Sequence, residues 1–271
     1  MFKQLMQDGT SLAKSSRLAT AFHWVSFFAI LLILMAGAQF FVRSIPYVSD
    51  EYCHFWLNIR TLIEGSWKRE ECLTTFPGYH FATATLMSFL GLKDINEARA
   101  LNGFWGIASA LLALAYFKDS GWTVRWLRAL QIFTFLLLIS YYFVVYTDVF
   151  SSLLVMAAFA SFEIGARQAS GILQLFAVLT RQTQIIWSVF LVLLQCLRHK
   201  AVTFKALLKV LKETWVSIFV IAAFGIWVLF SGSLAVGDKN MHPSFKLQLG
   251  NVWFFCIGSN PVFSAFARPP P

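Results

Sequence analysis

Two adjacent carboxylates, Asp50 and Glu51, follow closely on a long apolar stretch that runs from Thr20 to Val42. The chain has only 13 Asp and Glu among 271 residues, so an acidic pair at this place is unusual. Ionisable groups beside a membrane are costly to desolvate and mark functional sites. A carboxylate there could accept a proton from a hydroxyl nucleophile. The pair is therefore the first candidate for chemistry.

Only one of the two acids is expected to face a substrate, because adjacent residues on a helix point about 100° apart. Asp50 is the first candidate for a general base and Glu51 the second, and the other acid would hold a neighbour by hydrogen bonding. The alternative is that both acids occupy the first turn of a helix, where negative charge is favoured.

The composition is that of a polytopic membrane protein. Hydrophobic residues make up 58% of the chain and charged residues 13%, whereas soluble domains carry about 25% charged residues. The formal net charge is +9, but Lys and Arg lie mainly in short segments between apolar stretches. This pattern is typical of orientation signals in a membrane. We expect membrane lipid, and no nucleic acid, among the partners.

The apolar pattern predicts an all-α fold with a multi-span membrane domain over residues 20–266. A cytosolic segment, 1–19, precedes it and a Pro-rich tail, 267–271, follows it. No cleavable signal peptide is expected, since the first stretch is too long for a signal-peptide core. The apolar stretches are Thr20–Val42, Tyr79–Leu92, Leu101–Phe117, Trp126–Tyr146, Val149–Gly165, Ile172–Leu197, Glu213–Val236 and Leu247–Phe266.

Two of these stretches are ambiguous. As a helix, Tyr79–Leu92 would be roughly 21 Å long, short of a hydrocarbon core of about 30 Å, so it is expected to lie along the interface. Pro77-Gly78 favours a tight turn before it. Ile172–Leu197 is interrupted by Arg181, and is either one span with a buried Arg or two short spans around a polar turn.

The positive-inside rule favours the second alternative, with the N-terminus in the cytosol. Residues 43–78 then form a lumenal loop with short interfacial helices, and residues 198–212 form a basic cytosolic loop. Under this topology one lumenal face carries five features: Asp50, Glu51, Asp148, Arg181 and the Gly237–Pro243 loop. Acids and bases would meet where the apolar stretches end.

Five short strings along the chain resemble one known family. They are Ile45-Pro46-Tyr47-Val48-Ser49-Asp50-Glu51-Tyr52-Cys53-His54, Leu73-Thr74-Thr75-Phe76-Pro77-Gly78-Tyr79, Tyr146-Thr147-Asp148, Arg181-Gln182-Thr183-Gln184-Ile185-Ile186-Trp187 and Gly237-Asp238-Lys239-Asn240-Met241-His242. In order and apolar setting they are similar to the endoplasmic-reticulum alpha-1,2-glucosyltransferases that complete the lipid-linked oligosaccharide. Ser49 stands where that family usually has Met, and Phe76 where it has Pro.

The resemblance implies a multi-pass glycosyltransferase of the GT-C class in the endoplasmic-reticulum membrane, with its active face in the lumen, serving protein N-glycosylation. The donor would be dolichyl-phosphate glucose. The acceptor would be a dolichyl-diphosphate oligosaccharide already bearing two glucoses, and the transfer would invert the anomeric centre. Family members are longer, so this chain is expected to correspond to their N-terminal part.

Within this chemistry, several side chains are candidates for substrate contacts. Arg181 is the first candidate for the departing phosphate, because a guanidinium binds phosphate through two parallel hydrogen bonds. The alternative is a structural pair with Asp148. Lys239 and His242 come next, against a solvated loop as the alternative. His54 could orient the acid or touch sugar, and a plain interfacial histidine is the alternative.

No metal site and no cofactor are expected. The His and Cys residues lack ligand spacing, and no Asp-x-Asp string occurs. A Cys53–Cys72 disulfide is possible in an oxidising lumen, with two unpaired thiols as the alternative. Trp56 and Trp67 could stack on sugars or anchor the interface.

Two other functions fit the same pattern. Arg181 in a broken helix could line the permeation path of a transporter. A catalytically incomplete short form could instead act as a partner or regulator of other membrane proteins.

Overall fold

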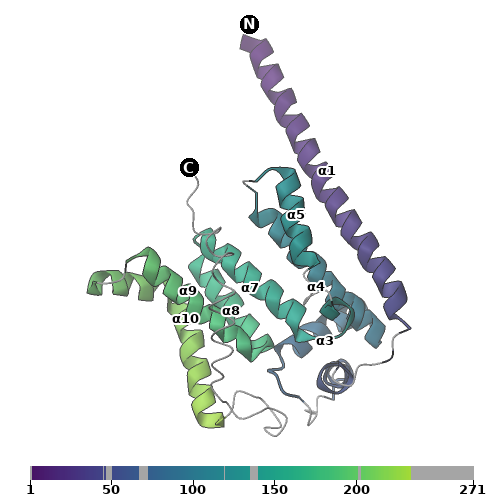
Figure 1. Cartoon of the computed structure of the whole chain (residues 1–271), viewed down its shortest axis with the longest axis vertical. Helices are drawn as coiled ribbons and strands as arrows, with labels where there is room; N and C mark the ends of the chain where they lie inside the picture. Colours follow the sequence, from purple (N-terminus) through teal and green to yellow (C-terminus); the bar gives the residue numbers. More distant parts are fainter. Residues whose placement is uncertain are drawn as a thin grey trace.

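The computed structural model describes residues 2–44, 46, 51–66, 73–118, 120–134, 140–200 and 203–232, with side chains in the first helix from Leu18 onward. Over these ranges the regular structure is helical throughout, with nine α-helices, three shorter helical turns and no strand (Figure 1). The all-α prediction is confirmed. Three helical segments are long and apolar enough to cross a membrane: Leu18–Phe40, Ile95–Tyr116 and Phe204–Ser231.

Helix α1, Phe2–Val42, includes both the polar N-terminal segment and the first apolar stretch in one continuous helix. It projects beyond the other helices at its N-terminal end (Figure 1). Phe27 and Leu31 pack into the core, whereas Phe22, Ile33 and Phe40 are about 70% exposed. Such a face would be unfavourable in water and is suited to lipid.

Helix α4, Ile95–Tyr116, is the most buried of the three spans and contacts α1, α5 and α7. A capping box fixes its start: the Asp94 carboxylate accepts from the backbone N–H of Glu97 at 3.0 Å, and the Glu97 carboxylate accepts from that of Asp94 at 3.0 Å. These bonds satisfy backbone donors that a helix start otherwise leaves free. The start of α4 is therefore rigid.

The stretch Trp126–Tyr146 is not one helix, contrary to prediction. Helix α5, Trp122–Phe133, ends early, and a 3₁₀ turn, η2, covers Ser140–Phe143. Asn102 of α4 donates to the carbonyls of Tyr141 and Val144, both at 2.7 Å, and Glu51 accepts from the backbone N–H of Val145. The side chains of Asn102 and Glu51 thus bind backbone groups of residues 141–145. Such distant contacts cannot be predicted from the apolar pattern of the stretch itself.

The stretch Ile172–Leu197 is split into α8, Arg167–Thr180, and α9, Ile185–Arg198, joined by the 3₁₀ turn η3, Gln182–Gln184. Gln168 at the start of α8 donates to the Lys212 carbonyl, and His199 after the end of α9 lies 2.9 Å from Glu213. Lys212 and Glu213 are neighbours on the helix that begins at Phe204, so the start of α8 lies beside the end of α9. The two helices therefore form an antiparallel hairpin with Arg181 at its tip. This is the second of the two predicted alternatives.

Helix α10, Phe204–Ser231, packs on both arms of this hairpin. It begins inside the segment 198–212, which was expected to be a loop, and Thr203 caps its start. The helix kinks at Thr214, whose hydroxyl donates to the Val210 carbonyl at 2.9 Å. Such a bond from a threonine to the preceding turn bends a helix.

Helix α7, Thr147–Glu163, runs parallel to α4, because contacts along the two helices advance in the same direction. Glu51 links Arg99 to Val145, Asn102 binds Val144, and the rings of Trp105, midway along α4, and Phe150, in the first turn of α7, pack 4.8 Å apart. The bundle therefore has two ends. The site end contains the end of α1, the starts of α4 and α7, the Arg181 tip and the end of α10. The basic end contains the α4–α5, α7–α8 and α9–α10 junctions.

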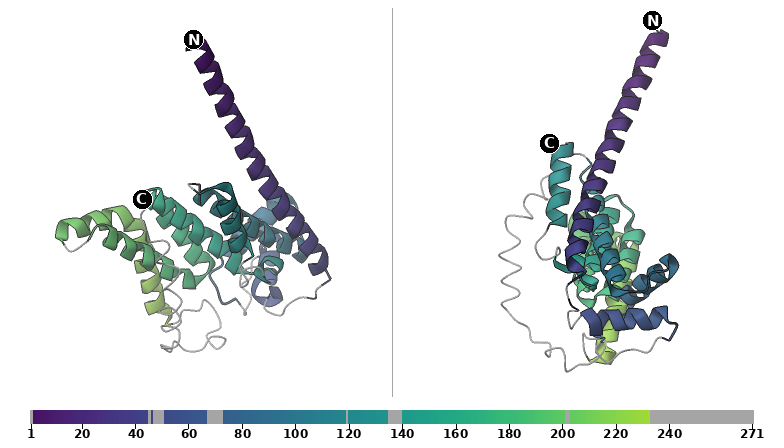
Figure 2. Two further views of the ribbon diagram at one scale, coloured as in Figure 1. Left: turned by 45° about the horizontal axis from the view of Figure 1, so that its top comes forward. Right: turned by 90° about the vertical axis from the view of Figure 1, so that its right-hand side faces the viewer.

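Cations gather near the junctions of the basic end, in the arrangement that the positive-inside rule requires of one side. They are Lys118, Arg125, Arg128, Arg167, Arg198, Lys200, Lys205, Lys209 and Lys212. Across the site end lie two short helices, α2, Leu57–Ile63, and α3, Gly78–Leu90, which are too short to span a bilayer (Figure 2).

Candidate functional site

Four of the five strings meet at the site end. The His54 carbonyl lies 3.0 Å from His80 Nε2, in the helix that follows the Pro77-Gly78 turn. Gln182 Nε2 donates to the Thr74 carbonyl at 2.9 Å. Asp148 and Arg181 form an ion pair. The fifth string, with Lys239 and His242, lies outside the described residues.

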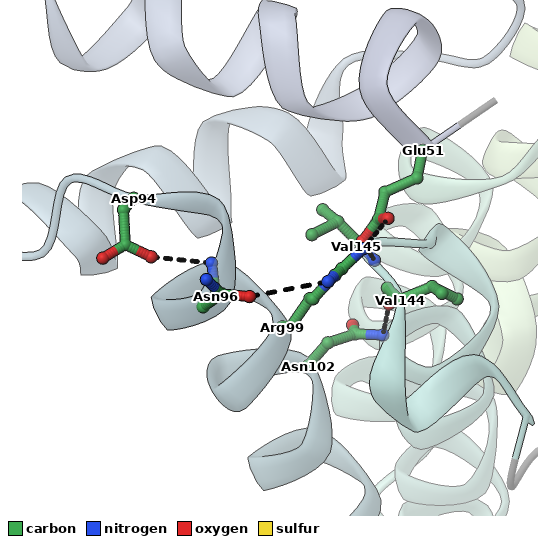
Figure 3. A network of polar contacts seen from close by, with 7 residues as sticks. All are labelled: Glu51, Asp94, Asn96, Arg99, Asn102, Val144 and Val145. Carbon is green, nitrogen blue, oxygen red and sulfur yellow. Dashed lines mark hydrogen bonds and ion pairs between the residues drawn. The ribbon is translucent and has the colours of Figure 1, made fainter. Parts of the chain in front are cut away.

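Glu51 is fully buried and forms a two-point ion pair with Arg99 of α4 (Figure 3). Arg99 Nε donates to Glu51 Oε1 at 2.8 Å, and Arg99 Nη2 donates to Oε2 at 2.6 Å. The backbone N–H of Val145 also donates to Oε1, at 2.8 Å. Both carboxylate oxygens are occupied, so Glu51 joins the π-helical turn η1, Glu51–Trp56, to α4 and to the segment before α7. We call this set the Glu51–Arg99 clamp.

A second buried contact supports the clamp one turn further along α4. Asn102 is fully buried, and besides its two bonds to the η2 region it accepts from the Tyr79 hydroxyl at 3.2 Å. Burial raises the pKa of Tyr79, which keeps its hydroxyl protonated as a donor. The start of α3 is thereby tied to α4 in the same layer as Glu51 and Arg99.

Asp50 lies outside the described residues, so its role as a base remains a prediction. Glu51, the neighbour of Asp50, is held in the clamp. Because Cα atoms of consecutive residues are about 3.8 Å apart, the Cα of Asp50 must lie close to the clamp. Glu51 itself has no exposed surface through which to meet a substrate hydroxyl. His54 is half-buried, and its carbonyl lies near the side chains of both Asn58 and His80.

The ion pair of Arg181 and Asp148 at the site end is partly accessible. The Arg181 side chain is 35% exposed and that of Asp148 21%. Asp148 lies in the first turn of α7, and Arg181 closes α8 in an extended conformation that ends the helix. The structure thus shows the predicted pair and also leaves part of the guanidinium open to a ligand.

The hairpin tip packs directly on the Pro77-Gly78 turn. A Cβ at Gly78 would lie 2.5 Å from the Leu179 carbonyl oxygen, closer than such atoms can approach. Glycine at this position therefore allows the loop of residues 73–77 to contact α8. Gln184, also in the hairpin tip, contacts α7 by donating to the Ser151 hydroxyl at 2.9 Å.

His80 is fully buried at the start of α3, stacked on Phe55 with the ring centroids 5.6 Å apart. Because a carbonyl only accepts, Nε2 must carry the proton in the contact with His54, and Nδ1 has no hydrogen-bond partner. Burial lowers the pKa of His80 to about 4, while the hydrogen bond to the His54 backbone opposes the shift. The imidazole is therefore neutral at physiological pH.

Acidification should loosen this part of the site end. An unfolded histidine binds its proton below about pH 6.5, and folded His80 does so only below about pH 4. The stabilisation is complete above pH 6.5 and is lost as pH falls towards 4. We expect the melting temperature of the purified chain to drop less between pH 7 and 5 in His80→Gln than in wild type. Equal slopes in wild type and His80→Gln would contradict this assignment.

Cys53 is disulfide-bonded, whereas Cys196 is a free thiol. The expected partner, Cys72, lies outside the described residues, so the pairing stays a prediction. Among the described residues no group of three or more His, Cys, Asp or Glu side chains is placed to hold a metal ion.

Sequence reasoning did not find three residues that organise the site end: Arg99, Asn102 and His80. Arg99 and Glu51 are 48 residues apart, and no spacing rule connects them. One signal was present. A cation, an amide and an imidazole inside apolar helices are costly unless they are paired, which marks such residues as parts of a polar network.

Comparison with known proteins identifies the family. The model of the DIE2/ALG10 family matches residues 45–203, which is more than half of the chain. A curated relative from Debaryomyces hansenii, a Dol-P-Glc:Glc(2)Man(9)GlcNAc(2)-PP-Dol alpha-1,2-glucosyltransferase, is 28% identical over 68% of this chain. The aligned region spans 43% of that relative. No solved structure matches. The chain belongs to the DIE2/ALG10 family.

Proposed function

We propose that the site end carries the catalytic site of a glucosyl transfer from dolichyl-phosphate glucose to a diglucosylated dolichyl-diphosphate oligosaccharide. The observation that carries this proposal is the meeting of four family strings in one contact network at one end of the bundle. The name of the Debaryomyces hansenii relative, an alpha-1,2-glucosyltransferase, supports the substrate classes. The active face would be the lumenal face of the endoplasmic-reticulum membrane, opposite the basic end.

In the proposed reaction Asp50 is the general base. Its carboxylate takes the proton of the acceptor hydroxyl as that oxygen attacks the anomeric carbon of the donor glucose. The bond from this carbon to the phosphate oxygen breaks with inversion, and dolichyl phosphate departs with the bonding electrons. One carboxylate is sufficient as the general base for this attack, just as one carboxylate activates the water in inverting glycosidases. Glu51, with both oxygens bound in the clamp, positions Asp50.

Arg181 is assigned to the departing phosphate. Its guanidinium is paired with Asp148 through Nη1, and the side chain as a whole is 35% exposed, which leaves room for a ligand. Asp148 would hold the Arg181 guanidinium in a fixed orientation, so that less conformational entropy is lost when the phosphate binds. Lys239 and His242 would add charge from the Gly237–Pro243 loop, and His54 would lie near the sugar.

Replacing Arg181 should weaken use of the donor far more than replacing a matched arginine at the basic end. We expect Arg181→Ala to raise KM for dolichyl-phosphate glucose about tenfold or more, since one charge-assisted contact to phosphate is lost. Arg198→Ala removes a comparably exposed pair, with Glu163, and should leave this KM unchanged. The measurement is transfer of labelled glucose from dolichyl-phosphate glucose in membranes that lack the endogenous enzyme. Equal effects of the two substitutions would contradict the phosphate assignment.

A further inference from the structure

A cleft of about 360 Å³ opens at the site end between α2 and the start of α4, separate from the Arg181 tip. One wall is formed by Arg60 and Ile63 of α2 and by Glu64, which follows the helix. The other wall and the floor are formed by residues 93–96 together with Trp56. Asn96 also lies 3.5 Å from Arg99 Nη1, so the cleft adjoins the Glu51–Arg99 clamp (Figure 3).

Hydrogen bonds order both walls of the cleft in the free chain. Arg60 Nε donates to Glu64 Oε1 at 2.7 Å on one side. On the other side the capping box holds the backbone of Lys93 and Asp94. Trp56 and Ile95 are almost fully buried and give the cleft an apolar floor. The capped backbone and the buried floor are preorganised, which reduces the conformational entropy lost on binding.

The charges of the cleft are balanced, because two cations, Arg60 and Lys93, face two anions, Glu64 and Asp94. A phosphate group would meet as much repulsion as attraction there. Neutral sugars fit better, since each hydroxyl both donates and accepts, and carboxylates stand beside guanidinium, ammonium and amide donors. An apolar floor with a few converging polar groups is typical of small-molecule sites.

We propose that this cleft binds the uncharged glycan of the acceptor at a distance from the reacting hydroxyl; this inference rests on the proposed glucosyl transfer. Arg60 follows Glu51 by nine residues of nearly continuous helix, a separation of roughly 13 Å. The single glucose of the donor, held at the reacting centre, would not reach the Arg60–Glu64 side of the cleft. A branched oligosaccharide can occupy both places, so the cleft would select for acceptor size.

The kinetic test uses the charge-neutral double substitution Arg60→Ala with Glu64→Ala. The KM for the full lipid-linked oligosaccharide should rise about tenfold. The KM for a lipid-linked disaccharide acceptor, the KM for the donor and kcat should not change. The matched control at the basic end, Glu163→Ala with Arg198→Ala, should leave all four quantities unchanged. An equal effect on both acceptors, or none on either, overturns the proposal.

A binding test separates failure of this proposal from failure of the proposed function. The probe is the free diglucosylated oligosaccharide, and its binding to the purified chain is followed by saturation-transfer NMR, which needs no turnover. Binding that the double substitution abolishes supports the cleft even if no glucose is transferred. Transfer by a chain whose oligosaccharide binding survives the double substitution overturns the cleft and leaves the transferase intact.

Discussion

Arg99→Ala should destabilise the folded chain more than any other single substitution at the site end. It leaves the Glu51 carboxylate, which has no exposed surface, without its counter-ion. Breaking a buried ion pair by removing one partner costs about 3–5 kcal/mol, because an uncompensated charge remains inside. We expect a lower melting temperature in detergent, lower abundance in membranes and loss of glucosyl transfer. The measurement is thermal unfolding of the purified chain followed by fluorescence.

A matched control exists within the chain. Arg125 of α5 is also buried, but its guanidinium donates to the backbone carbonyl of Leu114 and not to an acid. Arg125→Ala leaves no buried carboxylate and should cost about 1–3 kcal/mol. The double substitution Glu51→Gln with Arg99→Met should be milder than the sum of its single changes, as expected for coupled residues. Additive effects, or a larger cost at Arg125, would contradict the clamp.

Asp50→Asn should abolish the chemical step and leave the fold intact. A positioned general base contributes about 10²–10⁴-fold to rate, and asparagine keeps the size of the side chain without the proton acceptor. We expect kcat to fall by about three orders of magnitude with unchanged KM for both substrates and an unchanged melting temperature. Single-turnover transfer at saturating donor is the measurement that isolates this step.

Glu51→Gln is the comparison that separates chemistry from positioning. Glutamine cannot neutralise Arg99, so this variant should lose stability together with activity. If Asp50→Asn retains full rate while a stably folded Glu51→Gln loses it, the assignment of the two acids is reversed.

Local patterns in the sequence were sufficient for much of the fold. Apolar length predicted the spans within α1, α4 and α10, and the interruption at Arg181 allowed the hairpin that the structure contains. The cost of a lone charge between apolar segments also predicted a partner for Arg181, with Asp148 as the alternative to phosphate. These features depend on contiguous residues or on a single unpaired charge.

Long-range pairing was beyond such reasoning. The backbone just before α7 is held by Asn102, which binds Val144 from 42 residues away, and by Glu51, which binds Val145 from 94 residues away. The choice between Asp50 and Glu51 likewise needed Arg99, because helical geometry alone says only that the two side chains diverge. In the proposed mechanism, burial in three dimensions is the reason for assigning Glu51 to positioning.

The most direct test of the account is formation of the three-glucose lipid-linked oligosaccharide by this chain. Microsomes that lack the endogenous enzyme would receive the 271-residue chain, dolichyl-phosphate glucose and the two-glucose acceptor, with the product separated by chromatography. We expect the wild-type chain to form the three-glucose product, and an equally abundant Asp50→Asn variant to form none above background. Stable wild-type protein without conversion, or full conversion by Asp50→Asn, would contradict it.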